Sequence, residues 1–403
     1  MCEGAVRDPH AYFRRLREHD PVYWNSRHRA WVLTQHDHLS DELRSGDLTA
    51  ERITPFSAAV MAAASTDAGD IDATFRILSD WLVFKDPPEH TRLRKHLARA
   101  FVPSMVKARH DDIARTIADL LDNVSESGSG GGTVDLIREF AFPLPAVVIA
   151  QMLGVPPEDR NLFKEWSDQL TALVFGAYGN DDRFHTAARG MLDLRDYLVD
   201  LVERYRRAPG DNLISVLLEH EDGDALSRDE LVATCTLLLF GGHETTTNLI
   251  GNGMLALLSH PEQLVALRAD PDLIGPAIDE LLRYDGPARA TVRLVKHEHT
   301  VGDKVLSEGE RVFLVNLAAN RDPAAYPDPD RLDLQRRPTG HLGFGVGLHY
   351  CLGAPLARLE GQLALAALVD RFPGMSLAAG PDELDWHPTM LSRGLVELPV
   401  TLH

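Results

Sequence analysis

The sequence predicts a mainly α-helical protein with small β-sheets, an α+β fold. Two short alternating apolar runs, Val22 to Trp24 and Trp31 to Thr34, flank a polar turn and predict a hairpin near the N-terminus. Helical periodicity then dominates until about residue 290. Alternation returns from Thr291 to Val315, and a second small β region is expected at Leu395 to Leu402. Strands are therefore expected near both ends, with helices between them.

The composition indicates a globular chain with a substantial core. The chain has 403 residues, of which 44% are hydrophobic and 25% are charged. Length alone suggests two or three domains. The one low-complexity stretch, Ser127 to Gly132, is short and lies between helical patterns, so we expect a surface loop there and not a linker. We therefore expect a single domain over residues 1–403.

Charge and cysteine usage restrict the partners and the compartment. A net charge of -19 argues against a nucleic-acid partner. The three cysteines suggest no disulfide framework, which favours a reducing compartment and hence the cytoplasm. Asp8-Pro9 begins a predicted helix through Arg17, and neither a signal peptide nor a membrane anchor is expected. The most apolar stretch, Phe140 to Gly154, is interrupted by prolines and is too short to span a bilayer.

A long helix is predicted after Ser227, because Ser227 and Glu230 have the spacing of a capping box. The apolar pattern from Leu231 continues to about His260-Pro261, which gives roughly 33 residues and a length of about 50 Å. Its middle, residues 241–247, contains two adjacent glycines and three threonines, which are weak helix formers. We expect the helix to loosen or kink there, although a glycine pair also permits close helix packing.

Cys351 lies in a glycine-rich stretch that runs directly into a helical pattern beginning at Ala354. The free N–H groups of a first helical turn favour an anion, so the thiol is expected to ionise easily. Such a thiolate could be a nucleophile with His349 as its base, a zinc ligand or an axial iron ligand, and a buried structural cysteine is the fourth possibility. Zinc is disfavoured because His349 is the one further ligand type nearby and no second cysteine pair exists.

The whole pattern from Phe344 to Gly353, with Gly345, Gly347 and His349 in register with Cys351, resembles the haem-binding loop of the cytochrome P450 family. The resemblance implies that Cys351 is the proximal ligand of the iron in haem b (iron protoporphyrin IX), with Phe344 and Gly353 against the cofactor. Gly353 would let a flat partner approach without an intervening side chain.

The middle of the long helix resembles the oxygen-activation motif of the same family. Glu244 matches the acidic position of that motif and Thr245 matches the threonine, and these two residues would handle protons. Thr246 would point about 100° away around the helix.

Further segments match the family in the expected order. His90, Arg94, Arg293 and His349 match positions that bind the haem propionates. Glu280 and Arg283 are three residues apart on one predicted helix face, a spacing that usually gives a surface ion pair of little energetic value. The resemblance matches them instead to a buried Glu-Arg pair, and we assign Arg331 as its third member.

The resemblance implies a haem-dependent monooxygenase that hydroxylates or epoxidises an apolar organic substrate with dioxygen. Electrons would come from a ferredoxin or flavodoxin and an NAD(P)H-dependent reductase, because the chain lacks an appended flavin or iron-sulfur segment. We expect a soluble, bacterial-type monomer. The alternatives are a peroxide-driven peroxygenase, which typically lacks the acid-threonine pair, and a haem-based sensor.

Substrate contacts are expected in several apolar segments. Arg289 would meet a polar substrate tail or, as the simpler reading, would reach solvent. Arg92, Lys95 and Arg99 fall at helical spacing and form either a basic patch for an acidic electron donor or a solvated helix face. The expected substrate contacts are Phe84, Leu237, Gly241, Arg289 and Leu391, within segments that include Phe56 to Phe84, Phe175 to Phe184, Pro287 to Val292 and Met390 to Arg393.

Overall fold

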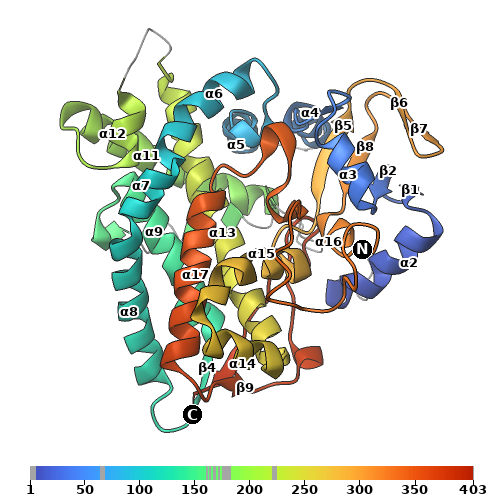
Figure 1. Cartoon of the computed structure of the whole chain (residues 1–403). Helices are drawn as coiled ribbons and strands as arrows, with labels where there is room; N and C mark the ends of the chain where they lie inside the picture. The colour runs from blue at the N-terminus through green and yellow to red at the C-terminus, as the bar shows by residue number, and fades with distance from the viewer. Residues whose placement is uncertain are drawn as a thin grey trace. The chain divides into compact units, whose positions relative to one another are not determined.

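The computed structural model describes residues 6–63, 69–159, 162, 165–166, 169–170, 173–174, 183–219 and 225–402 (Figure 1). The contacts between its Cα atoms divide the chain into two compact units. Unit 1 consists of Met1–Leu48, Val106–Pro145 and Glu244–His403, and unit 2 consists of Thr49–Met105 and Ala146–His243. Both units are built mainly from helices, and the small sheets are centred on unit 1.

The main sheet contains the predicted N-terminal hairpin. Strands β1 (Val22–Asn25) and β2 (Ala30–Leu33) pair antiparallel, with Trp24 opposite Trp31. β2 then pairs in parallel with β8 (Arg311–Leu314), which pairs antiparallel with β5 (Thr291–Val295). β3 (Leu48–Thr49) completes the order β1-β2-β8-β5-β3. The hairpin and the late β region are both confirmed.

Two smaller sheets lie in unit 1. β6 (His299–Val301) and β7 (Lys304–Leu306) form a two-stranded ribbon inside the predicted late β region. β10 (Pro399–Thr401), within the predicted C-terminal β region, pairs with β4 (Thr133–Asp135) and with β9 (Ser376–Leu377). The sequence did not reveal β4 and β9, because two or three residues are too few to show alternation.

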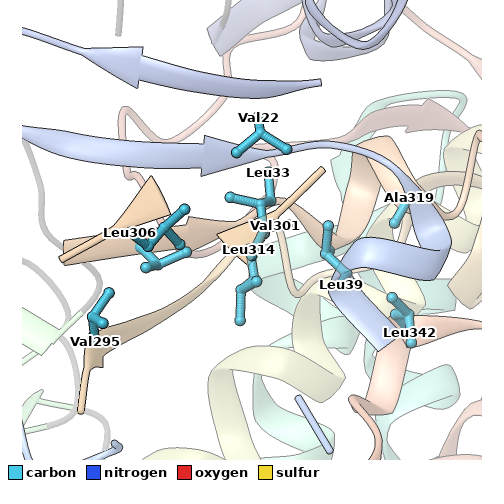
Figure 2. Close-up of a cluster of buried hydrophobic side chains, with 10 residues drawn as sticks. Val22, Leu33, Leu39, Val295, Val301, Leu306, Leu314, Ala319 and Leu342 are labelled. Atoms are coloured by element: carbon cyan, nitrogen blue, oxygen red, sulfur yellow. The ribbon is translucent and has the colours of Figure 1, made fainter. Parts of the chain in front are cut away.

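One apolar cluster holds the main sheet to the helix that follows its hairpin, α3 (His36–Glu42). Figure 2 shows side chains from the strands and from α3 meeting in this cluster. All of its members are almost fully buried, so the cluster supplies the hydrophobic free energy that fixes the sheet. The members are Val22, Leu33, Leu39, Val295, Val301, Leu306, Val312, Leu314, Ala319 and Leu342.

The helices of unit 1 include the predicted N-terminal helix, α2 (Pro9–His19). The Asp8 side chain caps it by accepting a hydrogen bond from the N–H of Ala11 at 3.0 Å. α17 (Ala354–Arg371) packs against both α8 (His110–Ser127) and α15 (Ile274–Asp285). The predicted surface loop begins one residue late, because Ser127 is the last residue of α8 and residues 128–132 follow it. Shorter helices are α14 (Pro261–Ala269) and α16 (Asn316–Ala319).

Unit 2 is helical throughout most of its described length. α5 (Gly69–Ser79) packs against α4 (Ile53–Ala63) and against α11 (Arg183–Arg207), which in turn contacts α12 (Leu213–Leu218). A single 3-10 turn, η1 (Leu82–Phe84), precedes α6 (Glu89–Ala98).

The chain passes between the two units inside regular elements. The four passages fall within β3, α7 (Pro103–Ala108), α9 (Pro143–Leu153) and α13 (Arg228–Ser259). No linker is therefore present at any of these passages, since each one is part of a helix or strand.

α13 is the predicted long helix, and its capping box is present. The Ser227 N–H donates to Glu230 Oε2 at 2.8 Å, and the Glu230 N–H donates to Ser227 Oγ at 3.2 Å. The helix is assigned continuously through Gly241 and Gly242, so the weak helix formers do not interrupt it. Within the described parts of the chain, no helix combines the length and apolarity needed to cross a membrane.

A histidine-carboxylate pair between β6 and α3 makes the stability of unit 1 depend on pH. His299 Nε2 lies 3.0 Å from Glu42 Oε2, and its Nδ1 lies 2.7 Å from the carbonyl oxygen of His297. Burial opposes the charge on His299, but these two acceptors raise its pKa above the ordinary value. Burial also raises the pKa of Glu42. Both groups therefore stabilise the folded state at low pH, and the contribution is lost as pH rises through their folded pKa values.

We expect His299→Gln to destabilise the protein at pH 6 by up to about 1 kcal/mol and to have a smaller effect at pH 8, since a partly exposed pair is screened. Thermal unfolding at both pH values measures this difference. His110→Gln, which changes a half-exposed histidine beside Asp111, is the matched control. An equal effect of His299→Gln at both pH values would contradict the assignment.

Candidate functional site

Cys351 is held in a closed turn between 3-10 helix η6 (Leu342–Phe344) and α17. Its N–H donates to the carbonyl oxygen of Phe344 at 2.9 Å, which closes the loop at its base. The turn η7 (Gly347–His349) lies between these two residues. Cys351 is only partly buried and comes three residues before the first residue of α17, so the residue lies just before a helix N-terminus.

The glycines of this loop serve two different purposes. Gly345 and Gly347 have φ values of 68° and 75°, a backbone region that other residues rarely adopt. A Cβ on Gly347 would also lie 2.7 Å from the carbonyl oxygen of Leu43. Gly353 has an ordinary φ of -80°, and a Cβ there would meet no atom within 4 Å. The fold itself therefore does not require glycine at position 353. A flat group lying against that backbone would require it, because a side chain would stand between the group and the backbone.

The other described cysteine is chemically different. Cys235 is fully buried, and burial raises the pKa of its thiol to about 12. It stays protonated at neutral pH and is therefore a poor ligand or nucleophile. Of Cys235 and Cys351, Cys351 is the one suited to bind a metal ion.

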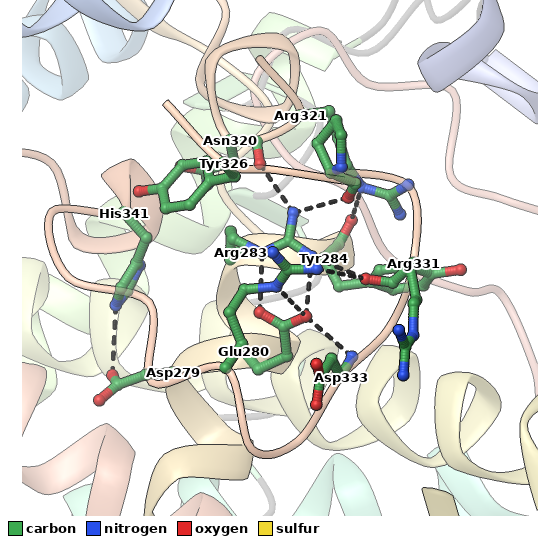
Figure 3. A network of polar contacts seen from close by, with 12 residues as sticks. Asp279, Glu280, Arg283, Tyr284, Asn320, Arg321, Tyr326, Arg331, Asp333 and His341 are labelled. Carbon is green, nitrogen blue, oxygen red and sulfur yellow. Dashed lines mark hydrogen bonds and ion pairs between the residues drawn. The ribbon is translucent and has the colours of Figure 1, made fainter. Parts of the chain in front are cut away.

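The predicted pair Glu280 and Arg283 is completely buried in α15. Arg283 Nε lies 2.7 Å from Glu280 Oε2, and Arg283 Nη2 lies 2.8 Å from Oε1 (Figure 3). The remaining N–H groups of Arg283 donate to the carbonyl oxygens of Asn320, Pro329 and Arg331 at 2.9, 2.7 and 3.3 Å. The burial that the family resemblance implied is therefore present, and a surface pair is excluded.

The assignment of Arg331 as the third member of this pair is wrong. The side chain of Arg331 is exposed, and the residue contributes only its carbonyl oxygen. Arg336 occupies the third position, with its Nε 3.2 Å from Glu280 Oε1. Arg336 also donates to the carbonyl oxygens of Pro327, Asp328 and Arg331. Its side chain therefore holds the loop of residues 327–331 in place.

In α13, Glu244 and Thr245 are partly exposed, whereas Thr246 is 3% exposed. Asn248, one turn further along, donates from Nδ2 to Glu244 Oε1 at 3.4 Å. Asn248 is itself buried against the backbone of Gly394. Glu244 and Thr245 are thus more exposed than Thr246, and the Glu244 carboxylate accepts a hydrogen bond from a buried amide.

Two expected substrate contacts come together in unit 1. The N–H of Arg289 donates to the carbonyl oxygen of Leu391 at 2.9 Å, and Ala288 forms an isolated bridge with Ser392. Arg289 is fully buried, so the simpler expectation that it reaches solvent is wrong. Further along β5, Arg293 is partly buried and donates from Nη1 to the carbonyl oxygen of Val292 at 2.9 Å.

Comparison with known proteins assigns the family. The cytochrome P450 family model matches residues 68–387. The chain belongs to the cytochrome P450 family. It is 45% identical over 324 residues to vitamin D(3) 25-hydroxylase of Pseudonocardia autotrophica, covering 80% of this chain and 77% of the relative. It is 40% identical over 319 residues to 6-deoxyerythronolide B hydroxylase of Saccharopolyspora erythraea, covering 79% and 76%.

The fold is also similar to those of solved P450 structures. A crystal structure of P450BioI in complex with hexadec-9Z-enoic acid ligated acyl carrier protein superimposes with a TM-score of 0.89 at 35% identity. The superposition covers 99% of this chain and 100% of the other. The chain is therefore a monooxygenase of the P450 class, whose family cofactor is a haem-thiolate group. The accessible Cys351 and the open Cβ direction at Gly353 fit such a group.

The residues of unit 2 that the P450 resemblance singled out lie on its helices. His90 is completely buried in α6, and Arg94 follows it by one turn. Phe84 stacks on Trp81 with ring centroids 6.1 Å apart. Leu237 is half-buried and Gly241 is exposed, and a Cβ on Gly241 would lie 3.8 Å from Leu237 Cδ1.

The three cations expected at helical spacing lie on α6 and at its C-terminal end. Arg92 forms an ion pair with Glu230, so its charge is compensated, while Lys95 and Arg99 are exposed. In the expected substrate segment Phe175 to Phe184, residues 175–182 lie outside the described residues.

Sequence reasoning missed three residues near the P450 cysteine loop: Asp279, His341 and Arg358. Asp279 Oδ1 accepts hydrogen bonds from Arg358 Nε at 2.9 Å and from His341 Nε2 at 3.2 Å. Asp279 precedes Glu280 directly, and Arg358 lies in the first turns of α17. In the sequence, these residues stand beside recognised motifs, and this was the signal that could have found them. It was missed because Asp, His and Arg are common on helix surfaces.

The different roles of the loop glycines lead to a prediction. Gly353→Ala should change the stability of the haem-free protein by less than about 1 kcal/mol, because the new methyl group meets nothing. The same variant should weaken haem affinity by about tenfold or more, as overpacking does. Haem titration and thermal unfolding of the haem-free protein measure the two effects.

Gly347→Ala is the matched variant, because its Cβ collides with the carbonyl oxygen of Leu43. It should destabilise the haem-free protein by about 1–3 kcal/mol through backbone strain. Equal behaviour of the two variants would show that Gly353 has no specific relation to the cofactor.

The pairing of Arg336 with Glu280 can also be tested. Arg336→Leu should destabilise the folded protein by about 3 kcal/mol, because it removes a cation from the buried Glu280 carboxylate. Arg331→Leu should stay within about 0.5 kcal/mol, since that side chain is exposed. Chemical denaturation compares the two arginines directly. A larger loss for Arg331→Leu would restore the original assignment.

Proposed function

We propose that this P450 holds haem b through the sulfur of Cys351 and inserts one oxygen atom of dioxygen into an apolar organic substrate. The observation that carries the proposal is the loop itself. It presents a partly exposed cysteine close to a helix N-terminus, next to a glycine whose Cβ direction is open. When bound, the haem-thiolate group supplies the activation of dioxygen.

Glu244 and Thr245 are proposed to deliver protons during this reaction. Both side chains are accessible on one turn of α13, and the Asn248 amide restrains the carboxylate at 3.4 Å. The Thr245 hydroxyl would hold a proton-donating water in place, and Glu244 would connect that water to solvent. Thr246 is 3% exposed, and we assign it no role in this step.

Four basic residues are proposed to bind the two haem propionates. They are His90 and Arg94 on α6, Arg293 on β5 and His349 in η7. Arg and His donors form charge-assisted hydrogen bonds to carboxylates, which are stronger than neutral ones. We also propose that residues 1–403 act as one catalytic domain, because all four passages between the units run inside a helix or strand.

Electrons are proposed to come from a separate ferredoxin or flavodoxin that is reduced by an NAD(P)H-dependent reductase. The described residues hold no cluster of His, Cys, Asp or Glu side chains that could bind a metal ion. The two described cysteines are too few for an iron-sulfur cluster. Both are free thiols, as is usual in a reducing compartment, and we propose a monomeric enzyme of the cytoplasm.

The proposed substrate is apolar and carries a polar group. The relatives act on vitamin D(3) and on 6-deoxyerythronolide B, and P450BioI binds a fatty acid carried by an acyl carrier protein. Leu391 and the buried Arg289 lie side by side, and we propose that they contact the substrate, Arg289 through its polar group. The other proposed contacts are Phe84, Leu237 and Gly241.

Spectroscopy of the purified holoenzyme tests the proposal. The reduced, carbon monoxide-bound form should show the Soret band of a thiolate-ligated haem, and Cys351→His should move it to the histidine-ligated position. Candidate polyketides, sterols and fatty acyl compounds can then be screened for a substrate-induced spin shift. A histidine-type band in the unmodified enzyme would overturn the assignment of Cys351.

The proton-delivery role leads to a separate prediction. Thr245→Ala should keep substrate binding but lower the product formed per electron consumed by about tenfold or more, because proton delivery fails. Thr246→Ala, on the buried neighbour, is the control and should leave this ratio unchanged. Electron consumption and product are measured together with a ferredoxin and its reductase.

Two other outcomes would redirect the assignment. Turnover with peroxide alone that survives Thr245→Ala would indicate a peroxygenase. Electron consumption that no candidate substrate increases would indicate a haem-based sensor.

A further inference from the structure

Asp279 connects helix α15 to both ends of the Cys351 loop through a single oxygen atom. Its Oδ1 accepts one hydrogen bond from Arg358 Nε at 2.9 Å and another from His341 Nε2 at 3.2 Å. Figure 3 shows the contact between Asp279 and His341 beside the buried Glu280. Burial alone would raise the pKa of Asp279, but these two donors hold it below its ordinary value. The group is therefore a carboxylate at neutral pH.

The hydrogen bonds of His341 define its tautomer and show that it caps the turn η6. Its Nδ1 accepts the N–H of Gly343 at 3.2 Å, so the ring carries its proton on Nε2 and donates it to Asp279. His341 thereby caps η6, the turn that ends at Phe344. A carboxylate in this position orients the ring, in the way that outer partners orient the ligands of a metal site.

Arg358 acts on the same loop from α17. Its guanidinium carbon lies 4.6 Å from the centroid of the Phe344 ring, and its Nη1 lies 3.2 Å from the Tyr350 hydroxyl. The rings of Phe344 and Tyr350 meet edge to face at 6.3 Å. Arg358 therefore touches the residue that begins the loop and the residue that immediately precedes Cys351.

The backbone transmits this restraint to the cysteine. Phe344 accepts the N–H of Cys351 at 2.9 Å, so the position of Phe344 sets the position of Cys351. Gly343 packs directly on α15, where a Cβ would lie 3.1 Å from Leu282 Cβ. Asp279 and Leu282 are three residues apart and thus share the helix face that the loop rests on.

We propose that Asp279 is a positioning residue for Cys351, which it orients through Arg358, His341 and the Phe344 turn. The inference rests on Cys351 being the haem ligand, as proposed above. Loss of the Asp279 charge weakens both hydrogen bonds at once, because a neutral amide oxygen is a poorer acceptor than a carboxylate. The ligand then has more conformational freedom and its sulfur is more easily protonated or displaced.

The test uses the intact holoenzyme and two spectroscopic readouts: the fraction of reduced, carbon monoxide-bound protein with thiolate-type absorption, and the haem reduction potential. Asp279→Asn should raise the fraction without thiolate absorption by about tenfold, the scale of outer-partner effects on metal sites. Asp279→Glu should recover part of the thiolate form, because the carboxylate charge is retained.

Variants at the partner and at a distant pair complete the design. Arg358→Leu should reproduce Asp279→Asn, and the double variant should be no worse than either single variant, because the two residues act as one unit. Arg358→Lys should lie between, since it retains the charge. The control is Asp122→Asn, which breaks an exposed ion pair between Asp122 of α8 and Arg371 of α17, the helix that also carries Arg358. This variant should leave both readouts unchanged.

Thermal unfolding separates positioning from plain stability. If Asp279→Asn and Arg358→Lys lower the unfolding temperature but keep the wild-type spectrum and potential, the role of Asp279 is structural and the inference is overturned. If the unmodified enzyme lacks thiolate absorption, the assignment of Cys351 itself fails. These two failures are distinguishable from the wild-type spectrum alone.

Discussion

The buried ion pair between Glu280 and Arg283 is the interaction on which the Cys351 side of the structure depends. Both side chains have zero exposure, so their desolvation costs several kcal/mol per ion. That cost is offset because Arg283 also binds three backbone carbonyl oxygens and Glu280 also binds Arg336 and the N–H of Asp333. Residues 320–336 contain no helix or strand, so the pair replaces the hydrogen-bonded ladder that they lack.

Two neighbouring faces of helix α15 hold irregular segments of the chain in place. One face carries Glu280 and Arg283 and organises the irregular segment before the loop. The other carries Asp279 and Leu282 and holds the loop itself. Since both pairs are spaced by three residues on one rigid helix, any rotation of α15 would disturb both segments together. Helix α15 contacts the loop through Asp279 and Leu282, and we propose that it positions the cysteine through these contacts.

Local signals predicted the elements well, and tertiary partners explain the errors. Ser227 with Glu230 and Asp8 with Pro9 are short-range caps, so the sequence marked both helix starts correctly. The choice between Arg331 and Arg336 depends on which side chain folds back toward Glu280. The spacing of residues in the sequence does not show this. The burial of Arg289 likewise follows from the segment around Leu391 that pairs with it from far along the chain. The same limit hid Asp279, whose two partners come from separate segments.

The order of strands in the main sheet has a consequence for synthesis of the chain. β2 pairs in parallel with β8, so the hairpin made first finds its neighbour only after the residues up to Leu314 have been made. Its β2 edge cannot form its native hydrogen bonds during that interval, and Leu33 and Val22 lack part of the cluster that buries them. The native partner of the β2 edge is therefore missing for most of translation. Unit 1 becomes competent to receive a cofactor only near the end of that process.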